Sequence, residues 1–221
     1  AIYVSGRLSV NVNQGVAGSL RLQANAITLN PGARLEANGE EGGLITVAAN
    51  DSIWNSAVIQ ANGGNGRGGT ITLAAANDQS FTQASLQANG TTDGGALTIT
   101  TASGDIYFTN SLIQTNGSTG RGGSIGLSAA NETSLFGAVI TAQGAKQGGQ
   151  ILIGNDANHK LQSAIPFSIT TTIDAHSFIS TEGDSGSNSG GFIETSGHTL
   201  NLLGSINAGR GGMWLIDPSD L

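Results

Sequence analysis

The segment GGTITL, at residues 68–73, recurs as GGALTI at residues 94–99. Two glycines followed by alternating apolar residues form this pattern, which occurs six times along the chain. Its members are GGLITV (42–47), GGTITL (68–73), GGALTI (94–99), GGSIGL (122–127), GGQILI (148–153) and GGFIET (190–195). Their first glycines are 26, 26, 28, 26 and 42 residues apart. A nearly fixed period of this length predicts a solenoid, in which each repeat packs on its neighbours.

A second, independent marker has the same period. It comprises short segments such as LEANG and ISTEG, which end at Gly39, Gly63, Gly90, Gly117, Gly144, Gly183 and Gly209. A looser strand lies between the two markers, with apolar residues at Ile53, Phe81, Ile106, Leu135 and Leu200. Three short strands per repeat and no helical periodicity predict an all-β fold, namely a parallel β-helix (β-solenoid) with about seven coils of roughly 26 residues. Because parallel crossovers are overwhelmingly right-handed, we expect a right-handed helix.

Alternation along the strands predicts which side chains enter the core. Inward positions are expected at Ile71, Leu73, Leu97, Ile99, Ile125 and Leu127, which would form one narrow aliphatic core. Outward positions after the paired glycines are expected at Thr46, Thr72, Thr98, Gly126, Leu152 and Glu194. Asn38, Asn62, Asn89 and Asn116 occupy the same turn in four successive repeats. We interpret them as a ladder of stacked amides that hydrogen-bond to one another, as in cross-β stacks.

The whole chain, residues 1–221, fits one domain. Its period slips once, within residues 155–177, where we expect a loop or hairpin that projects from the β-helix. Insertions of this kind often form the binding face of a repeat protein.

Composition excludes several classes of function. A net charge of −7 with only eight basic residues argues against binding to nucleic acid or to an anionic membrane. Cysteine is absent, so there is no disulfide or thiolate chemistry. No apolar run is long enough for a membrane span, and the first ten residues lack the features of a signal peptide. An export signal, if present, is therefore expected upstream of this segment.

Candidate chemical sites are weak in the sequence. The glycines at 64, 66 and 69 match a dinucleotide-binding spacing, but no helical pattern follows them. His159, His176 and His198 lack the spacing of metal ligands. The close acid pairs Glu40–Glu41 and Glu182–Asp184 could hold calcium, although solvated turn residues are the simpler interpretation. Four glycosylation sequons, starting at Asn50, Asn89, Asn116 and Asn131, match the number expected by chance. We predict no catalytic, cofactor-binding or metal site.

The C-terminal segment SGGFIETSGHTLNLLGSINAGRGGMWLIDPSDL, residues 189–221, resembles a known family. FIETSGH followed by WLIDP is similar to the end of the secretion region of filamentous-haemagglutinin-like exoproteins. These are the secreted members of bacterial two-partner secretion systems. The resemblance implies export through a dedicated outer-membrane transporter, folding outside the cell as a β-helix, and a secreted or cell-surface location. The NPNGI-type motif of the family is absent from this chain.

Two functions from different classes remain open. The first is an extended adhesin or structural shaft that binds a glycan or protein on a host or matrix surface, with a tendency to associate end to end because neither end shows a cap. The second is a carbohydrate-active β-helix enzyme, either a polysaccharide lyase or a hydrolase. An outward cluster of carboxylates, or of a carboxylate with an arginine, would favour the enzyme, and the outward positions assigned above predict none.

Overall fold

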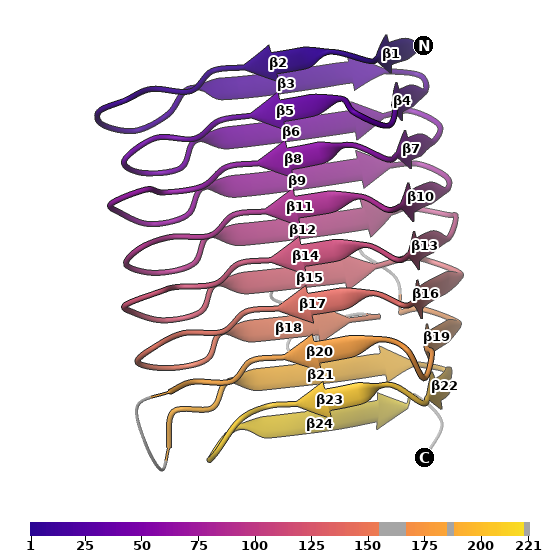
Figure 1. Cartoon of the computed structure of the whole chain (residues 1–221). Helices are drawn as coiled ribbons and strands as arrows, with labels where there is room; N and C mark the ends of the chain where they lie inside the picture. The colour runs from indigo at the N-terminus through magenta and orange to yellow at the C-terminus, as the bar shows by residue number, and fades with distance from the viewer. Residues whose placement is uncertain (155–166, 185–187, 219–221) are drawn as a thin grey trace.

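The computed structural model describes residues 1–154, 167–184 and 188–218. Every regular element in these ranges is a strand, and consecutive strands enter three parallel sheets in turn. Figure 1 shows the coils stacked along one axis. Each sheet contains eight strands, which corresponds to about seven full turns. The predicted parallel β-helix is therefore confirmed. Among the described residues, no helix is long and apolar enough to cross a membrane.

Each sheet takes every third strand of the chain. The first sheet contains β1 (Ile2–Val4), β4 (Ile27–Leu29), β7 (Ile53–Asn55), β10 (Gln79–Thr82), β13 (Ile106–Thr109), β16 (Glu132–Phe136), β19 (Thr170–Ile173) and β22 (Thr199–Leu202). The second sheet contains β2 (Arg7–Ser9), β5 (Arg34–Glu36), β8 (Val58–Gln60), β11 (Ser85–Gln87), β14 (Leu112–Gln114), β17 (Val139–Thr141), β20 (Phe178–Ser180) and β23 (Ser205–Asn207). The third, which we call the Gly-Gly sheet, contains β3 (Ser19–Ala24), β6 (Leu44–Ala49), β9 (Thr70–Ala75), β12 (Ala96–Thr101), β15 (Ser124–Ser128), β18 (Gln150–Ile153), β21 (Phe192–Gly197) and β24 (Met213–Pro218).

The register of the Gly-Gly sheet follows the sequence repeat. Leu97 pairs with Ile71 on one side and with Ile125 on the other, and all three side chains are at most 1% exposed. Thr98 follows Leu97 in the strand and is half-buried on the outer face. The predicted inward and outward assignment of this sheet is therefore confirmed in the central coils. A shift by one residue would have reversed every side chain.

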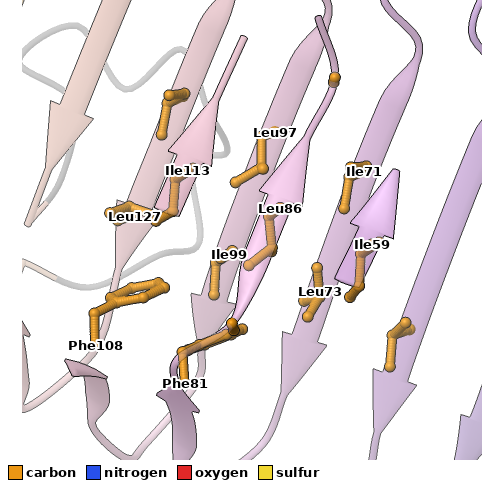
Figure 2. Close-up of a cluster of buried hydrophobic side chains, with 14 of the residues drawn as sticks. Ile59, Ile71, Leu73, Phe81, Leu86, Leu97, Ile99, Phe108, Ile113 and Leu127 are labelled. Atoms are coloured by element: carbon orange, nitrogen blue, oxygen red, sulfur yellow. The ribbon is translucent and has the colours of Figure 1, made fainter. Parts of the chain in front are cut away.

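Aliphatic side chains from all three sheets meet in a narrow core (Figure 2). Ile59 and Leu86 come from the second sheet, and they face leucines and isoleucines of the Gly-Gly sheet. The first sheet contributes Phe81 of β10 and Phe108 of β13, whose rings stack with centroids 4.4 Å apart. Stacked aromatic pairs of this kind add to the stabilisation from area burial alone.

The core is less purely aliphatic than the sequence predicted. Gln79 is fully buried, and its Nε2 donates to the Thr100 carbonyl at 2.7 Å. Further along the helix, Thr133 and Thr171 are fully buried as well. The hydroxyl of Thr171 donates to the Ser196 carbonyl at 2.6 Å. The Thr133 hydroxyl accepts the Ala129 backbone N–H and pairs with the Ser168 hydroxyl. These polar side chains are tolerated in the interior because each makes at least one hydrogen bond there, although Gln79 Oε1 has no partner.

Part of the segment predicted to project from the β-helix, residues 155–177, belongs to a regular turn of the β-helix. Thr170–Ile173 form β19, which pairs in register with β16 of the first sheet. The prediction was therefore wrong for these residues, because the repeat resumes earlier than its glycine markers show. Residues 155–166 lie outside the described residues.

The asparagine ladder exists, but its hydrogen bonds differ from those predicted. Each side-chain Oδ1 accepts the backbone N–H of the equivalent residue in the next coil, at 2.7–2.9 Å. The ladder joins Asn11, Asn38, Asn62, Asn89, Asn116 and finally Gln143. True amide-to-amide stacking occurs instead in the second sheet, where Gln60 donates to Gln87 and Gln87 to Gln114. Both ladders fix the register between coils.

Replacing one ladder asparagine should weaken the fold modestly. Asn89→Ala removes the acceptor of the Asn116 N–H, 2.8 Å away, so we expect a loss of about 1 kcal/mol in the free energy of unfolding. Asn65→Ala is the matched control, because Asn65 is an exposed residue of a neighbouring turn. Denaturant melts of both variants would measure the difference. Equal stabilities would show that the Asn89 side chain does not hold the coils together.

Candidate functional site

An open groove of about 870 Å³ runs along the stacked glycine pairs. Its floor is made by the backbone of these pairs in successive coils. One wall is formed by the residues that precede each pair, namely Glu41, Arg67, Asp93, Arg121 and Gln147. The other wall is formed by the first residues of the following strands, namely Leu44, Thr70, Ala96, Ser124 and Gln150. The groove therefore follows the helix axis.

Close packing between coils requires glycine on the groove floor. A Cβ at Gly94 would overlap the carbonyl oxygen of Thr115, and one at Gly95 would overlap the carbonyl oxygen of Gly69. These obstacles are backbone atoms, which cannot move aside as a flexible side chain can. The glycines are thus explained by coil stacking, and they leave a floor that bears no side chains.

The first wall of the groove carries alternating charges. Asp93 lies between two arginines, with its Oδ2 at 3.6 Å from Arg67 Nε and 3.8 Å from Arg121 Nη2. Its Oδ1 also accepts the backbone N–H of Arg121 at 2.8 Å. This backbone hydrogen bond and the nearby guanidinium groups hold the pKa of Asp93 below its ordinary value, although burial opposes them. Asp93 is therefore ionised at neutral pH and unsuited to act as a general acid there.

Neutralising Asp93 should destabilise the protein slightly at neutral pH. Because the folded pKa is depressed, the carboxylate stabilises the fold at neutral pH, and this contribution is lost as the pH falls through the folded pKa. We expect Asp93→Asn to cost about 0.5–1 kcal/mol at pH 7, and the cost to shrink in acid and in high salt. Glu182→Gln is the control, since the Glu182 carboxylate makes no ion pair with the described residues. Urea melts at several pH values would measure both, and a pH-independent difference would argue against the ion pairs.

Sequence reasoning missed this charged wall. The signal was present, since the residues directly before the paired glycines read Glu, Arg, Asp, Arg and Gln. Equivalent positions of a parallel stack lie about 4.8 Å apart. Opposite charges at that spacing attract, whereas like charges would repel.

A second column of acids lies at the turn leading into the first sheet. Asp78, Asp105 and Glu132 occupy equivalent positions in three successive coils. An Oδ1 of each aspartate accepts the backbone N–H of the next acid, at 3.0 and 3.1 Å. The Tyr107 hydroxyl lies 3.1 Å from Asp105 Oδ2 and 3.2 Å from Glu132 Oε2. Burial, together with these carboxylates, raises the pKa of Tyr107.

The expectation of no outward acid cluster was therefore wrong. Both the Arg67–Asp93–Arg121 group and the acid column meet the criterion set for an enzyme. The prediction considered only the outward positions within the strands of the Gly-Gly sheet. Arg67, Asp93 and Arg121 precede the glycine pairs, and Asp78 and Asp105 precede strands of the first sheet, where alternation does not specify direction. Glu132 is the first residue of β16 in that sheet, which the prediction did not consider.

Outward positions of the Gly-Gly sheet are not equally exposed. Thr46 and Thr72 are half-buried, but Leu152 is only 5% exposed and Glu194 only 1%. The hydroxyl of Ser196 donates to Glu194 Oε1 at 2.7 Å. Alternation specifies the side of a sheet on which a residue lies, and not what covers that side.

The acidic residues and histidines that the sequence offered as metal ligands do not come together in one site. Glu40 accepts the Gly15 backbone N–H at 2.6 Å, while Glu41 belongs to the groove wall. His176 is exposed beside Asp174, and the His198 ring lies 6.0 Å from that of Phe167. His159 lies outside the described residues. Within the described part of the chain, no three His, Asp or Glu side chains are grouped to hold a metal ion.

Comparisons with known proteins do not assign the chain to a family. No protein-family model matches the chain, and no curated protein matches it. Among solved structures, it is similar to the secretion domain of HMW1 from Haemophilus influenzae, at 15% sequence identity and a TM-score of 0.49. That likeness covers 97% of this chain and 93% of the HMW1 domain. At this identity and TM-score it carries no functional inference.

Proposed function

We propose that this chain is part of an extended exoprotein of the two-partner secretion type, in which the β-helix serves as an adhesive shaft outside the cell. The observation that carries the proposal is the motif pair FIETSGH and WLIDP at residues 192–198 and 214–218. The two halves lie on adjacent strands, because β21 pairs with β24. Trp214 Nε1 donates to Thr195 Oγ1 at 3.1 Å, so the motif acts as one structural unit.

The architecture supports a shaft. Every coil is joined to its neighbours by backbone ladders in three sheets, and side-chain ladders of asparagine at a turn and of glutamine in the second sheet add to them in the central coils. Length then grows in proportion to the number of coils, at about 4.8 Å per coil. Absence of cysteine is compatible with passage through a transporter as an unfolded chain. On this proposal the partners are a dedicated outer-membrane transporter during export and a surface glycan or protein afterwards.

Transporter-dependent export is the test of this proposal. The full-length gene would be expressed with and without its neighbouring outer-membrane transporter gene, and the chain would be followed in the medium and on intact cells. We expect extracellular protein only when the transporter is present. Equal export without any transporter, or retention in the cytoplasm in both strains, would overturn the proposal. Replacing Trp214 and Thr195 together would show whether the motif acts in export or only in stability.

End-to-end association is expected of the isolated segment, whose last coil exposes apolar side chains. Trp214 and Ile216 pair with the inward residues Ile193 and Thr195, yet they are 39% and 47% exposed. We expect the isolated segment to sediment as concentration-dependent oligomers, and Ile216→Ser to weaken them, since apolar surface drives such contacts. Met213→Ser is the control, because Met213 is exposed on the outer side of the same strand. A single species at all concentrations would contradict the expectation.

The carbohydrate-active enzyme remains the second candidate. It is favoured by one observation, the acid column with Tyr107 beside the first sheet. Release of products from polysaccharides would test this second candidate.

A further inference from the structure

One column on the outer face of the first sheet has an aromatic residue in every second coil. Tyr3 pairs with Thr28, and Thr28 pairs with Trp54. Trp54 pairs with Ser80, and Ser80 pairs with Tyr107. Aromatic rings therefore alternate with small hydroxyl residues along five successive coils. We call these five residues the aromatic column; Figure 1 shows their strands, β1, β4, β7, β10 and β13, stacked along one side of the molecule.

These rings are available to a ligand. Tyr3 is 73% exposed and Trp54 is 47% exposed. Large aromatic side chains that stabilise a core are usually much more buried than this. Tyr107 is half-buried, and its hydroxyl lies within hydrogen-bond distance of the Asp105 and Glu132 carboxylates, to either of which it can donate. The column is therefore a row of three aromatic residues along the axis of the β-helix, in which contacts of its hydroxyl restrain Tyr107.

The spacing selects the shape of the ligand. Two coils correspond to about 9.6 Å, since parallel strands lie about 4.8 Å apart. In an extended β-1,4-linked polysaccharide, successive sugars are turned over, so the same ring face recurs once per disaccharide. The disaccharide repeat of such a chain is close to the spacing of two coils. Aromatic rings pack against the apolar face of a pyranose ring. Polysaccharides with α-linkages coil, so their sugars would not follow a straight row of rings.

The residues around the aromatic column favour a ligand without negative charge. None of the strands of the first sheet contains lysine or arginine. Asp105 lies on one side of Tyr107, and the exposed Thr109 lies on the other. The carboxylates would repel an anionic polymer, whereas they and the hydroxyls can hydrogen-bond to the hydroxyls of a neutral sugar.

We propose that the aromatic column is a binding surface for a neutral, extended β-1,4-linked polysaccharide, of the cellulose or chitin class. The inference deepens the adhesive function proposed above, and it rests on that function only in taking the ligand to be a surface glycan. The polymer lies along the helix axis, with alternate sugars over Tyr3, Trp54 and Tyr107. It does not involve the glycine-floored groove, which lies elsewhere on the coil.

Retention of the folded chain on insoluble polysaccharides tests the proposal. We expect binding to cellulose or chitin and none to starch or to alginate beads. Trp54→Ala should weaken that binding about tenfold or more, because one stacked ring is lost from the centre of the row. Phe136→Ala is the matched control, since Phe136 is 40% exposed on the same sheet but outside the column. Preference between cellulose and chitin would identify the sugar.

A variant with altered spacing distinguishes binding by the regular row of rings from nonspecific binding by exposed aromatic residues. Exchanging Trp54 and Ser80, as Trp54→Ser with Ser80→Trp, keeps the number of aromatic residues but breaks their two-coil spacing. We expect it to bind as weakly as Trp54→Ala. In a Trp214→Phe background, the fluorescence of Trp54 should change on addition of cellohexaose or chitohexaose. Circular dichroism would confirm that each variant is folded.

Three results would overturn the proposal: no binding of the unaltered chain to either polymer, equal losses for Phe136→Ala and Trp54→Ala, or full binding by the exchanged variant. None of these would affect transporter-dependent export. Conversely, a failure of the export experiment would leave the binding results standing, so the two proposals fail separately.

Discussion

Ile125→Asp should unfold the protein or come close to it. Ile125 is 1% exposed and lies between Leu97 and Ile151 in the Gly-Gly sheet. A carboxylate there would be buried among aliphatic side chains without a partner, which costs several kcal/mol. Total stabilities of domains are only about 5–15 kcal/mol. Denaturant melts or hydrogen exchange would measure the loss.

The control for Ile125→Asp is Thr72→Asp, on the outer face of the same sheet. Both neighbours of Thr72 in its column, Thr46 and Thr98, are half-buried threonines that face solvent, so the change should stay within about 0.5 kcal/mol. Thr98→Asp is a less clean control, because its other neighbour, Gly126, is buried. If Thr72→Asp were as damaging as Ile125→Asp, the assignment of inner and outer faces would be wrong.

Gly94→Ala should be nearly as damaging, although it adds a single methyl group. The new Cβ would overlap the carbonyl oxygen of Thr115 and the backbone nitrogen of Gly123 in the next coil. Since both are backbone atoms, the coils would have to separate locally, and we expect a loss of about 3 kcal/mol or more. Thermal melts with calorimetry would measure it.

Gly64→Ala is the matched control for the glycine prediction. A Cβ at Gly64 would meet only the Gly39 carbonyl oxygen, at an ordinary contact distance of 3.4 Å, and no left-handed backbone conformation is needed there. The change should be neutral or slightly stabilising, because alanine restricts the unfolded chain. A mild effect of Gly94→Ala, equal to that of Gly64→Ala, would show that coil spacing is looser than the structure shows.

The sequence was sufficient for the fold because the repeat and the alternation are both strong. Paired glycines marked the start of each Gly-Gly strand, and Leu97, Thr98 and Ile99 have the predicted faces. The details of the ladders were not predictable in the same way. An asparagine in a stacked turn can bond to a neighbouring amide or to a backbone N–H, and the structure selects the second for Asn89.

The candidate binding surfaces were harder to predict from the sequence than the fold was. Tyr3, Trp54 and Tyr107 are 51 and 53 residues apart, close to two repeats each, but the register of the first sheet is needed to show that they share one face. Likewise, the burial of Leu152 and Glu194 depends on what packs over the Gly-Gly sheet, which alternation does not reveal. The charged groove wall had a plain sequence signal too, in the residue before each glycine pair.

The central claim is that this β-helix binds and extends rather than catalyses, and product release from polysaccharides tests it most directly. The folded chain, Asp93→Asn and Asp105→Asn would be incubated with cellulose, chitin and uronate polymers, and new reducing ends and unsaturated products would be quantified. The claim predicts no release above the level of the two variants, because Asp93 is held as an ion-paired carboxylate and an Asp105 oxygen accepts the Glu132 N–H. Release by the unaltered chain that either substitution abolishes would contradict the claim and establish an enzyme.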